Sequence, residues 1–400
     1  MPNLIKIVVA GDVNSGKSTL IGRYLYESGS LNQGAIEDIQ QVCKNLERNF
    51  EFAYLLDSFQ EEREKELTIN TTQCFCKSGK RNILFIDVPG HQELLKNMLS
   101  GASHADTAIL VIDINKPIND QTKRHAFILK FLGISNIITI INKMDICNFN
   151  QAEFLRTKKL ILDVFKNIGI EFQECLPVSS SQGENLFKRS KMMPWYKGKS
   201  LKELLDNIKI KKNPDNFRFL IQDVYKKGGE NIAAGILSSG RIKKKSAVFV
   251  YPEQKEFRIE KIKYFNKSIR FAKAPLAIGI TLNNNYNLKR GQVLCANHLP
   301  KITQTILAKI IVTRPINPNT ALSFHCATQN EMVKFKRVDQ IWDTANLLPK
   351  KGPLKINDLA QVILETAHKV VTEKYQDSHS LGRFVLVDSR QKISAIGVIL

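Results

Sequence analysis

The chain has 400 residues, with 59 Lys and Arg against 38 Asp and Glu, and a formal net charge of +21. Hydrophobic residues make up 43% and charged residues 24%, which is typical of a soluble globular protein. No apolar run is long enough to span a bilayer, and the first residues lack the apolar core of a signal peptide. We therefore exclude an integral membrane protein, expect no membrane partner, and expect a cytoplasmic protein of two or three domains.

The positive charge lies mainly in the second half of the chain. Residues 201–400 carry 34 Lys and Arg and 16 Asp and Glu, a net charge of +18, whereas residues 1–200 carry +3. This asymmetry indicates either a polyanionic partner, such as RNA or an acidic protein, or a lysine-rich solvated surface. The seven cysteines form no C-x-x-C pair, so we expect reduced thiols and no metal site built from Cys and His.

Residues 1–211 alternate apolar strands with amphipathic helices. The predicted strands are 5–10, 67–76, 82–87, 107–113, 136–142 and 173–178, and the predicted helices include 92–99, 121–132 and 151–168. This alternation predicts a mostly parallel sheet covered by helices on both faces. A nucleotide would bind at the carboxyl ends of its strands.

After a polar linker at residues 211–216, the pattern changes to short β-rich runs broken by turns. The predicted strands are 217–224, 232–238, 247–251, 257–264, 276–282 and 292–296, then 303–312, 322–327, 333–342, 360–365, 382–387 and 392–399. Many short strands at this spacing predict barrels. We therefore expect an α/β domain at 1–211 followed by two β-barrel domains at 217–300 and 301–400.

The first chemical motif, Gly-Asp-Val-Asn-Ser-Gly-Lys-Ser at 11–18, lies between a predicted strand and a predicted helix, as a P-loop requires. Gly11 and Gly16 allow main-chain N–H groups to point at phosphate oxygens, which the helix dipole also favours. Lys17 is expected to reach the β- and γ-phosphates, and the Ser18 hydroxyl to ligate Mg²⁺. The predicted nucleotide contacts here are Gly11, Asp12, Asn14, Ser15, Gly16, Lys17, Ser18 and Thr19. Two interpretations of Asn14 stay open, a monovalent-cation ligand or a turn-stabilising residue.

The second motif, Asp-Val-Pro-Gly-His at 87–91, follows the predicted strand 82–87. We expect Asp87 to hold Mg²⁺ through a water, the Gly90 N–H to bond the γ-phosphate, and His91 to orient the attacking water. Thr68 is expected to complete the Mg²⁺ coordination, which makes residues 30–70 a switch loop. The predicted catalytic residues are therefore Lys17, Thr68 and His91, and the predicted metal ligands are Ser18, Thr68 and Asp87.

The third motif, Asn142-Lys143-Met144-Asp145, also follows a predicted strand. Asp145 can accept two hydrogen bonds from guanine N1 and N2, a pair that adenine cannot offer. We expect the Lys143 stem to lie over the base, Asn142 to tie this loop to residues 11–18, and Met144 to pack in the core.

Ser179 and Ser180 begin a serine-rich turn after the predicted strand 173–178. In chain order after the other motifs, these two residues are predicted nucleotide contacts, and the N–H near Ser180 is expected to bond guanine O6. Together the motifs predict a P-loop GTPase domain that binds GTP with Mg²⁺. Hydrolysis would proceed by in-line attack of water, with Mg²⁺ and Lys17 neutralising charge and no general base of shifted pKa.

With these motifs in order and two β domains behind them, the whole chain resembles the elongation factor Tu family of translational GTPases. Within that family it is most similar to the large GTP-binding subunits of heterodimeric sulfate adenylyltransferases. The stretches that carry this closer resemblance are 87–91, 97–103, 120–125, 193–198, 277–282 and 382–388.

The resemblance implies a small catalytic sulfurylase subunit as partner, in a heterodimer or higher assembly. That subunit would make adenylyl sulfate and pyrophosphate from ATP and sulfate, and this chain would drive the reaction by hydrolysing GTP. The alternative is an elongation-factor-like GTPase that binds aminoacyl-tRNA, which the basic second half favours. The chain departs from the family at Asn14, where Asp is common, at Glu66, where Gly is usual, and at Val88, where Thr is common.

Overall fold

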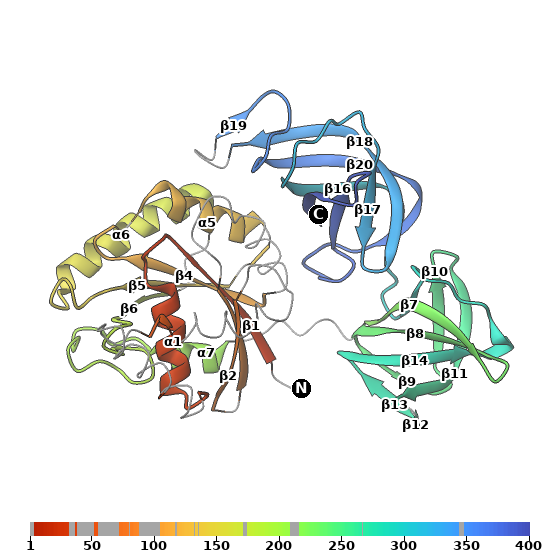
Figure 1. The fold of residues 1–400 in the computed structure, drawn as a ribbon, viewed down its shortest axis with the longest axis horizontal. Helices are drawn as coiled ribbons and strands as arrows, with labels where there is room; N and C mark the ends of the chain where they lie inside the picture. The colour runs from red at the N-terminus through yellow and green to blue at the C-terminus, as the bar shows by residue number, and fades with distance from the viewer. Residues whose placement is uncertain are drawn as a thin grey trace. The chain divides into compact units, whose positions relative to one another are not determined.

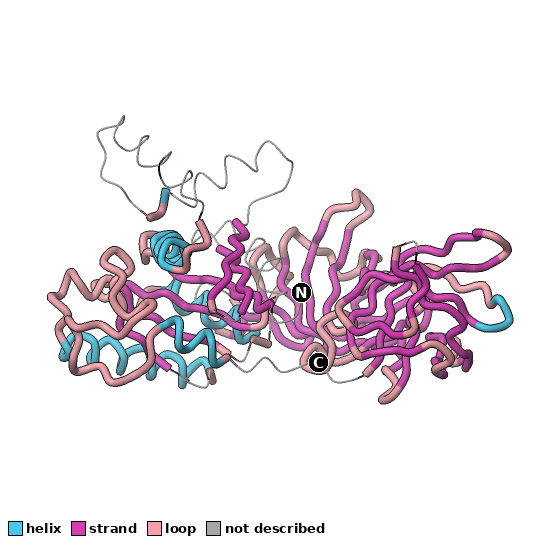
Figure 2. Tube along the Cα trace, turned by 90° about the horizontal axis from the view of Figure 1, so that it is seen from below, coloured by secondary structure: helices cyan, strands magenta, loops and turns pink. Residues whose placement is uncertain are grey.

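The computed structural model describes residues 4–31, 37, 52–54, 72–79, 81–87, 105–116, 118–131, 133–134, 136–170, 174–208, 216–265, 267–343 and 348–400. The chain forms two compact units that divide near residue 210. Figure 1 shows helices around a sheet in the first unit, and Figure 2 shows the second unit to be built mainly of strands. Each unit has its own buried apolar core.

The first unit contains a six-stranded sheet in the order β2-β3-β1-β4-β5-β6. Its strands are β1 (Leu4–Gly11), β2 (Thr72–Ser78), β3 (Arg81–Asp87), β4 (Thr107–Asp113), β5 (Ile137–Asn142) and β6 (Glu174–Pro177). All neighbouring pairs are parallel except β2 and β3. The carboxyl ends of β1, β3, β4 and β5 therefore meet at one edge of the sheet.

Helices cover both faces of this sheet. The described helices are α1 (Lys17–Glu27), α5 (Asp120–Phe131), α6 (Gln151–Ile168) and α7 (Leu201–Asn207). Side chains of α1 and α7, such as Leu20 and Leu205, join alternate strand residues such as Ile7 and Val9 in one buried cluster. On the opposite face, α5 packs against β1 and β4, and α6 against β5.

The second unit begins with a closed ring of six antiparallel strands. Its strands, in ring order, are β10 (Ala247–Tyr251), β15 (Val293–Ala296), β7 (Phe217–Lys227), β8 (Glu230–Ser239), β14 (Leu276–Leu282) and β11 (Lys255–Tyr264). Pairing between β10 and β11 closes the ring. Outside it, β12 (Lys267–Ile269) pairs with β11, and β9 (Arg241–Lys243) pairs with β13 (Phe271–Lys273).

A second closed ring follows in the same unit. Its strands, in ring order, are β17 (Leu322–Cys326), β21 (Arg383–Val387), β22 (Ile393–Ile399), β16 (Lys301–Val312), β20 (Leu359–Thr372) and β18 (Gln329–Trp342). Pairing between β17 and β18 closes this ring, and β19 (Pro349–Lys350) extends β18. The predicted fold class, an α/β domain followed by two β-barrels, is confirmed.

A buried arginine joins the two barrels. Arg218, at the start of β7, is 1% exposed, and its guanidinium pairs with Glu373 at 2.6 Å. The same group donates to the carbonyls of Phe217, Ala296, Asn297 and His298. The guanidinium thus binds Glu373 of the second barrel and the carbonyls of the connection at 297–298. Since Arg218 belongs to the first barrel, these bonds hold both groups against it.

Two predicted elements lie partly or wholly outside the described residues, and one differs from the structure. Residues 67–71 of the predicted strand 67–76 are not described, so described β2 begins at Thr72, and the predicted helix 92–99 also lies outside the described residues. In the second barrel, β20 continues to Thr372, beyond the predicted end at residue 365. The division of the second unit into domains at 217–300 and 301–400 stays a prediction.

Candidate functional site

The turn from β1 to α1 wraps tightly at the carboxyl edge of the first sheet. A Cβ atom on Gly11 would lie 2.3 Å from the Val111 carbonyl oxygen, and one on Gly16 would lie 2.3 Å from Asn142 Nδ2. Gly16 also has φ +89°, in the left-handed region that favours glycine. Both glycines are therefore required by the close approach of neighbouring strands.

Lys17, the first residue of α1, folds back over this turn. Its ammonium donates to the carbonyl oxygens of Gly11 at 3.0 Å and Asp12 at 2.8 Å. The side chain is 8% exposed. Burial lowers the pKa of Lys17, and the carboxylates of Asp87 and Asp12 oppose that shift. A buried cation held by neutral carbonyls is well suited to an anionic ligand.

A buried hydroxyl in the same turn has no hydrogen-bond partner among the residues that the structure describes. Ser15 is 1% exposed, and its Oγ has no hydrogen-bond partner in the structure as described. Polar groups that are buried and unsatisfied cost free energy unless a ligand or water pairs with them. The orphaned Ser15 Oγ beside Lys17 therefore fits a phosphate-binding turn.

Ser18 and Asp87 meet across the sheet edge. The Ser18 hydroxyl, one residue into α1, donates to Asp87 Oδ2 at 3.1 Å, and Asp87 is the last residue of β3. One hydroxyl and one carboxylate, completed by phosphate oxygens and water, fit the hard oxygen ligands that Mg²⁺ takes at nucleotide sites. Across the described ranges there is no cluster of three or more His, Cys, Asp or Glu that could hold a metal without such a ligand.

Asn142 joins the turn at 11–18 to the serine-rich turn. Its Nδ2 donates to the Ser15 carbonyl oxygen at 2.9 Å. Its Oδ1 accepts from the Ser180 N–H at 3.0 Å and from the Ser180 hydroxyl at 2.8 Å. Asn142 is 1% exposed. The N–H of Ser180 itself is therefore already a donor to Asn142, and the guanine O6 contact of an N–H near Ser180 stays a prediction.

The carboxylate of Asp145 is held by Ser179. The Ser179 hydroxyl donates to Asp145 Oδ1 at 2.5 Å and lies 3.1 Å from the Ser181 hydroxyl. Met144 is fully buried, and its N–H donates to the Val178 carbonyl at 3.1 Å. Asp145 itself is half-buried and lies beside the turn that contains Ser180.

Lys143 has a partner that the sequence does not predict. Its ammonium pairs with Asp113 Oδ2 at 2.7 Å, because β4 and β5 align Asp113 with Asn142. Lys143 also has φ +65°, in the left-handed region. Asp113 is thus a further residue of this edge, and the only sequence signal for it is its place at the end of a strand.

Of the remaining predicted residues, the structure describes some and leaves others outside its described part. Asn14 is exposed with φ +62°, and Thr19 is half-buried in the first turn of α1. The predicted residues Thr68, Gly90 and His91 lie outside the described part of the chain, as do the departures Glu66 and Val88. Their roles stay predictions.

A histidine that the sequence analysis did not assign lies beneath the turn. His125 of α5 is 3% exposed, and its Nδ1 has no hydrogen-bond partner within the described ranges. Its Nε2 lies 3.3 Å from Gln121 Nε2. Burial lowers the pKa of His125 to about 3, and the nearby charge of Lys17 acts in the same direction. The imidazole is therefore neutral near pH 7.

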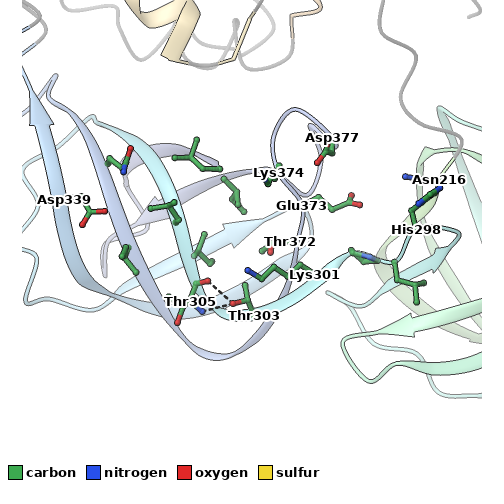
Figure 3. Close-up of a pocket in the computed structure, with 18 of the residues that line it drawn as sticks. Asn216, His298, Lys301, Thr303, Thr305, Asp339, Thr372, Glu373, Lys374 and Asp377 are labelled. Carbon is green, nitrogen blue, oxygen red and sulfur yellow. Dashed lines mark hydrogen bonds between the residues drawn. The ribbon is translucent and has the colours of Figure 1, made fainter.

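A groove of about 1370 Å³ lies on the second barrel, beside the connection between the barrels. Its lining includes His298 of that connection and Lys301, Glu373 and Lys374 of the second barrel. Figure 3 shows these side chains together with the hydrogen bonds between Thr303 and Thr305. The Glu373 carboxylate is already paired with Arg218, and none of residues 11–18, Asp87 or Asp145 lines the groove. The groove is therefore not the candidate nucleotide site, despite its size.

No described helix is both long enough and apolar enough to cross a membrane. The structure describes six of the seven cysteines, and these six form no disulfide with one another. The position predicted to form a switch, residues 30–70, is described only in part.

Comparison with known proteins adds two family matches. Residues 2–214 match the model of the elongation factor Tu GTP binding domain, and residues 305–400 match the GTP-eEF1A C-terminal domain-like model. The chain is 34% identical over 421 residues to elongation factor 1-alpha of Pyrococcus furiosus, covering 98% of this chain and 96% of that protein. It is 28% identical over 418 residues to sulfate adenylyltransferase subunit 1 of Bacteroides thetaiotaomicron, covering 100% of this chain and 86% of that protein.

One solved structure with similarity over the whole chain is sup35 complexed with GDP. The sequence identity is 23%, the TM-score is 0.45, and the match covers 100% of this chain and 94% of that one.

Proposed function

Because the chain belongs to the elongation factor Tu family of GTP-binding proteins, we propose that it is the GTP-hydrolysing subunit of a sulfate adenylyltransferase. GTP hydrolysis on this chain would drive the formation of adenylyl sulfate and pyrophosphate from ATP and sulfate on a small partner subunit. The observation that carries the sulfate assignment is the end-to-end similarity to sulfate adenylyltransferase subunit 1. The stretches 193–198 and 382–388 support it.

In this proposal the edge of the first sheet binds the nucleotide. On binding, the Lys17 ammonium exchanges its bonds with the carbonyls of Gly11 and Asp12 for phosphate oxygens. Asp145, oriented by the Ser179 hydroxyl, accepts from guanine N1 and N2 and disfavours adenine. Asn142 holds the phosphate-binding and base-binding turns at a fixed separation.

The reaction is phosphoryl transfer to water. Lys17 neutralises charge that develops on the transferred phosphoryl group, and its buried position strengthens that interaction. Mg²⁺, held at Ser18 and Asp87, would supply further charge neutralisation when bound. Among the residues outside the described ranges, His91 is proposed to orient the attacking water and Thr68 to sense the γ-phosphate.

A coupled assay tests the proposal. The chain is co-expressed with a small sulfurylase subunit, and sulfate-dependent pyrophosphate release from ATP is measured with GTP, with GDP and without guanine nucleotide. We expect release to rise severalfold with GTP only. The control is the same complex with Lys17→Ala, which removes the cation that the phosphates need, and in which GTP should have no effect. Absence of GTP stimulation in the unaltered complex would reject the sulfate assignment while leaving GTP binding intact.

The second candidate function is an elongation-factor-like GTPase that binds aminoacyl-tRNA. Elongation factor 1-alpha relatives are 32–34% identical over 98% of the chain. Exposed basic and aromatic residues lie on and beside the strands outside the first ring. Examples are Lys243 on β9, Lys267 on β12, and Phe265 just after β11, which is 87% exposed. Cations interleaved with exposed aromatic rings are typical of surfaces that bind single-stranded nucleic acid.

Filter binding of charged tRNA in the presence of GTP distinguishes the two candidates. The elongation-factor assignment predicts binding that weakens steeply between about 50 and 200 mM salt, because phosphate contacts release counterions. It also predicts weaker binding with GDP than with GTP. Binding that is equal for charged and uncharged tRNA would argue for a lysine-rich surface with no specific RNA function.

A further inference from the structure

The phosphate-binding turn is fastened to α5 by one asparagine. Asn119, immediately before α5, donates from Nδ2 to Asp12 Oδ2. Its Oδ1 accepts from the Thr122 N–H at 2.8 Å and from the Thr122 hydroxyl at 3.0 Å. The same carboxamide therefore caps the N-terminus of α5 and holds a carboxylate of the turn.

This double contact requires a side chain at position 119 that both accepts and donates hydrogen bonds. A cap must present an acceptor to the third N–H of the helix, and Asp, Ser, Thr and Asn can all do so. The contact with Asp12 needs a donor as well, which an ionised aspartate lacks. Asn supplies both from one planar group, and because Oδ1 is occupied by Thr122, Nδ2 is left facing Asp12.

Both carboxylate oxygens of Asp12 accept hydrogen bonds. Oδ1 accepts from the Val13 N–H at 2.7 Å, and Oδ2 accepts from Asn119. The carbonyl oxygen of the same residue accepts from the Lys17 ammonium at 2.8 Å. A fixed Asp12 thus sets both the path of the turn after Gly11 and one resting position of Lys17.

The charge of Asp12 adds to this effect. Burial disfavours the charged form of Lys17, and the negative charges of Asp87 and Asp12 favour it. An Asp12 carboxylate released from Asn119 would be free to rotate toward the phosphate site. A carboxylate there repels a polyphosphate, whereas one held at α5 supports Lys17 without meeting the ligand.

We infer that Asn119 is a positioning residue for nucleotide binding, which holds the Asp12 carboxylate away from the phosphates and keeps the turn shaped around Lys17. This inference rests on the proposed binding of GTP at the turn. It applies to GDP and GTP alike, because the turn contacts phosphates that both nucleotides share.

The test is a charge exchange between the two positions. The variants Asn119→Asp, Asp12→Asn and the double variant Asp12→Asn/Asn119→Asp are made in the full chain, and GDP and GTP dissociation constants are measured by titration with fluorescent nucleotides. Asn119→Asp keeps the helix cap but sets two carboxylates against each other, so affinity should fall about tenfold or more for both nucleotides. Asp12→Asn removes one of the two acceptors and should also weaken binding.

The double variant restores the hydrogen bond between the two positions with its direction reversed, since a new amide at position 12 can donate to a new carboxylate at position 119. The bonds from Val13 and Thr122 keep their direction, because both new side chains retain an acceptor oxygen. We expect its affinity to return to within about threefold of the unaltered chain. The matched control is Asn150→Ala, which removes the corresponding cap of α6, where Asn150 accepts from the N–H groups of Ala152 and Glu153. It should lower thermal stability without changing the dissociation constants.

Two results would overturn the inference. One is an Asn119→Asp variant that binds both nucleotides as tightly as the unaltered chain. The other is a double variant whose loss equals the sum of the single losses, since no bridging contact would then exist. If the unaltered chain binds neither GDP nor GTP, the proposed function fails, and this outcome is distinct from both.

Discussion

Asn142 offers the sharpest test of how the site is assembled. Its side chain makes three hydrogen bonds while 1% exposed, one to the Ser15 carbonyl and two from Ser180. Asn142→Ala removes all three and leaves the Ser180 N–H buried without its acceptor. Each unsatisfied group costs about 1–3 kcal/mol, so we expect a loss of about 4 kcal/mol in the free energy of unfolding of the first unit.

Each unit contains one tryptophan, and the measurement uses the one in the first unit. In a Trp342→Phe background, Trp195 is the remaining tryptophan of the chain, and its fluorescence during urea unfolding reports the first unit. Ser180→Ala removes one of the two bonds to Asn142 Oδ1 and leaves the other, so it should cost about 1 kcal/mol. Asn115→Ala, at an exposed position, should change the unfolding free energy by less than about 0.5 kcal/mol.

Nucleotide affinity provides the second readout. Because Asn142 links both turns, Asn142→Ala should weaken GDP binding by well over tenfold, while Ser180→Ala should weaken it only severalfold. If Asn142→Ala costs no more than Ser180→Ala in stability and leaves GDP affinity unchanged, the two turns are positioned independently. The argument from the three bonds would then be wrong.

Three further predictions concern separate parts of the molecule. Asp145→Asn should weaken GTP binding about a hundredfold and improve binding of xanthosine triphosphate, because the new amide donor faces a carbonyl in xanthine; equal losses for both nucleotides in competition binding would contradict this. Burial lowers the pKa of His125 from 6.5 to about 3 in the folded chain, so the unfolded chain takes up the proton at higher pH than the folded chain does. The free energy of unfolding therefore falls as pH drops below about 6.5, by about 1.4 kcal/mol per pH unit. Urea unfolding at pH 7.5 and about 5.5 measures this loss, and His125→Gln should reduce it. Arg218→Met should cost about 3–5 kcal/mol in the second unit, because Glu373 loses its partner, and Arg218→Met combined with Glu373→Leu should recover part of that loss. Urea unfolding in a Trp195→Phe background, in which Trp342 reports the second unit, measures both; no recovery would show that the carbonyl contacts dominate.

Local spacing could predict that residues 11–18, Asp87 and Asn142 lie at the ends of strands. The nucleotide contacts of these residues stay predictions. The contact between Asn119 and Asp12 could not be predicted, since 107 residues separate them and only the order of β1 and β4 in the sheet brings them together. The pairing of Lys143 with Asp113 depends in the same way on the register of β4 and β5.

The barrels were predicted as a class from the spacing of short apolar runs. The three-residue strands β9 and β13 were not, because each is too short for an alternation pattern and becomes a strand only by pairing with the other. The extension of β20 to Thr372 has a similar cause. Its last residues pair with the start of β16 after a bulge, and a bulge interrupts the alternation that the sequence analysis relied on.

Closure of both rings limits how another protein can recognise the second unit. Each of the twelve ring strands has a neighbour on both sides, but some long strands are paired over only part of their length. β15 pairs with residues 217–220 of β7, and β22 pairs with residues 308–312 of β16. Where both neighbours pair, a foreign peptide cannot extend the barrel by strand addition. Within the described residues, β9, β12, β13 and β19 each pair on one side only, with three residues or fewer, which is too short to anchor an added strand. Recognition at the paired parts of the barrels must therefore depend on side chains and connecting loops, which surface substitution can map without disturbing the backbone.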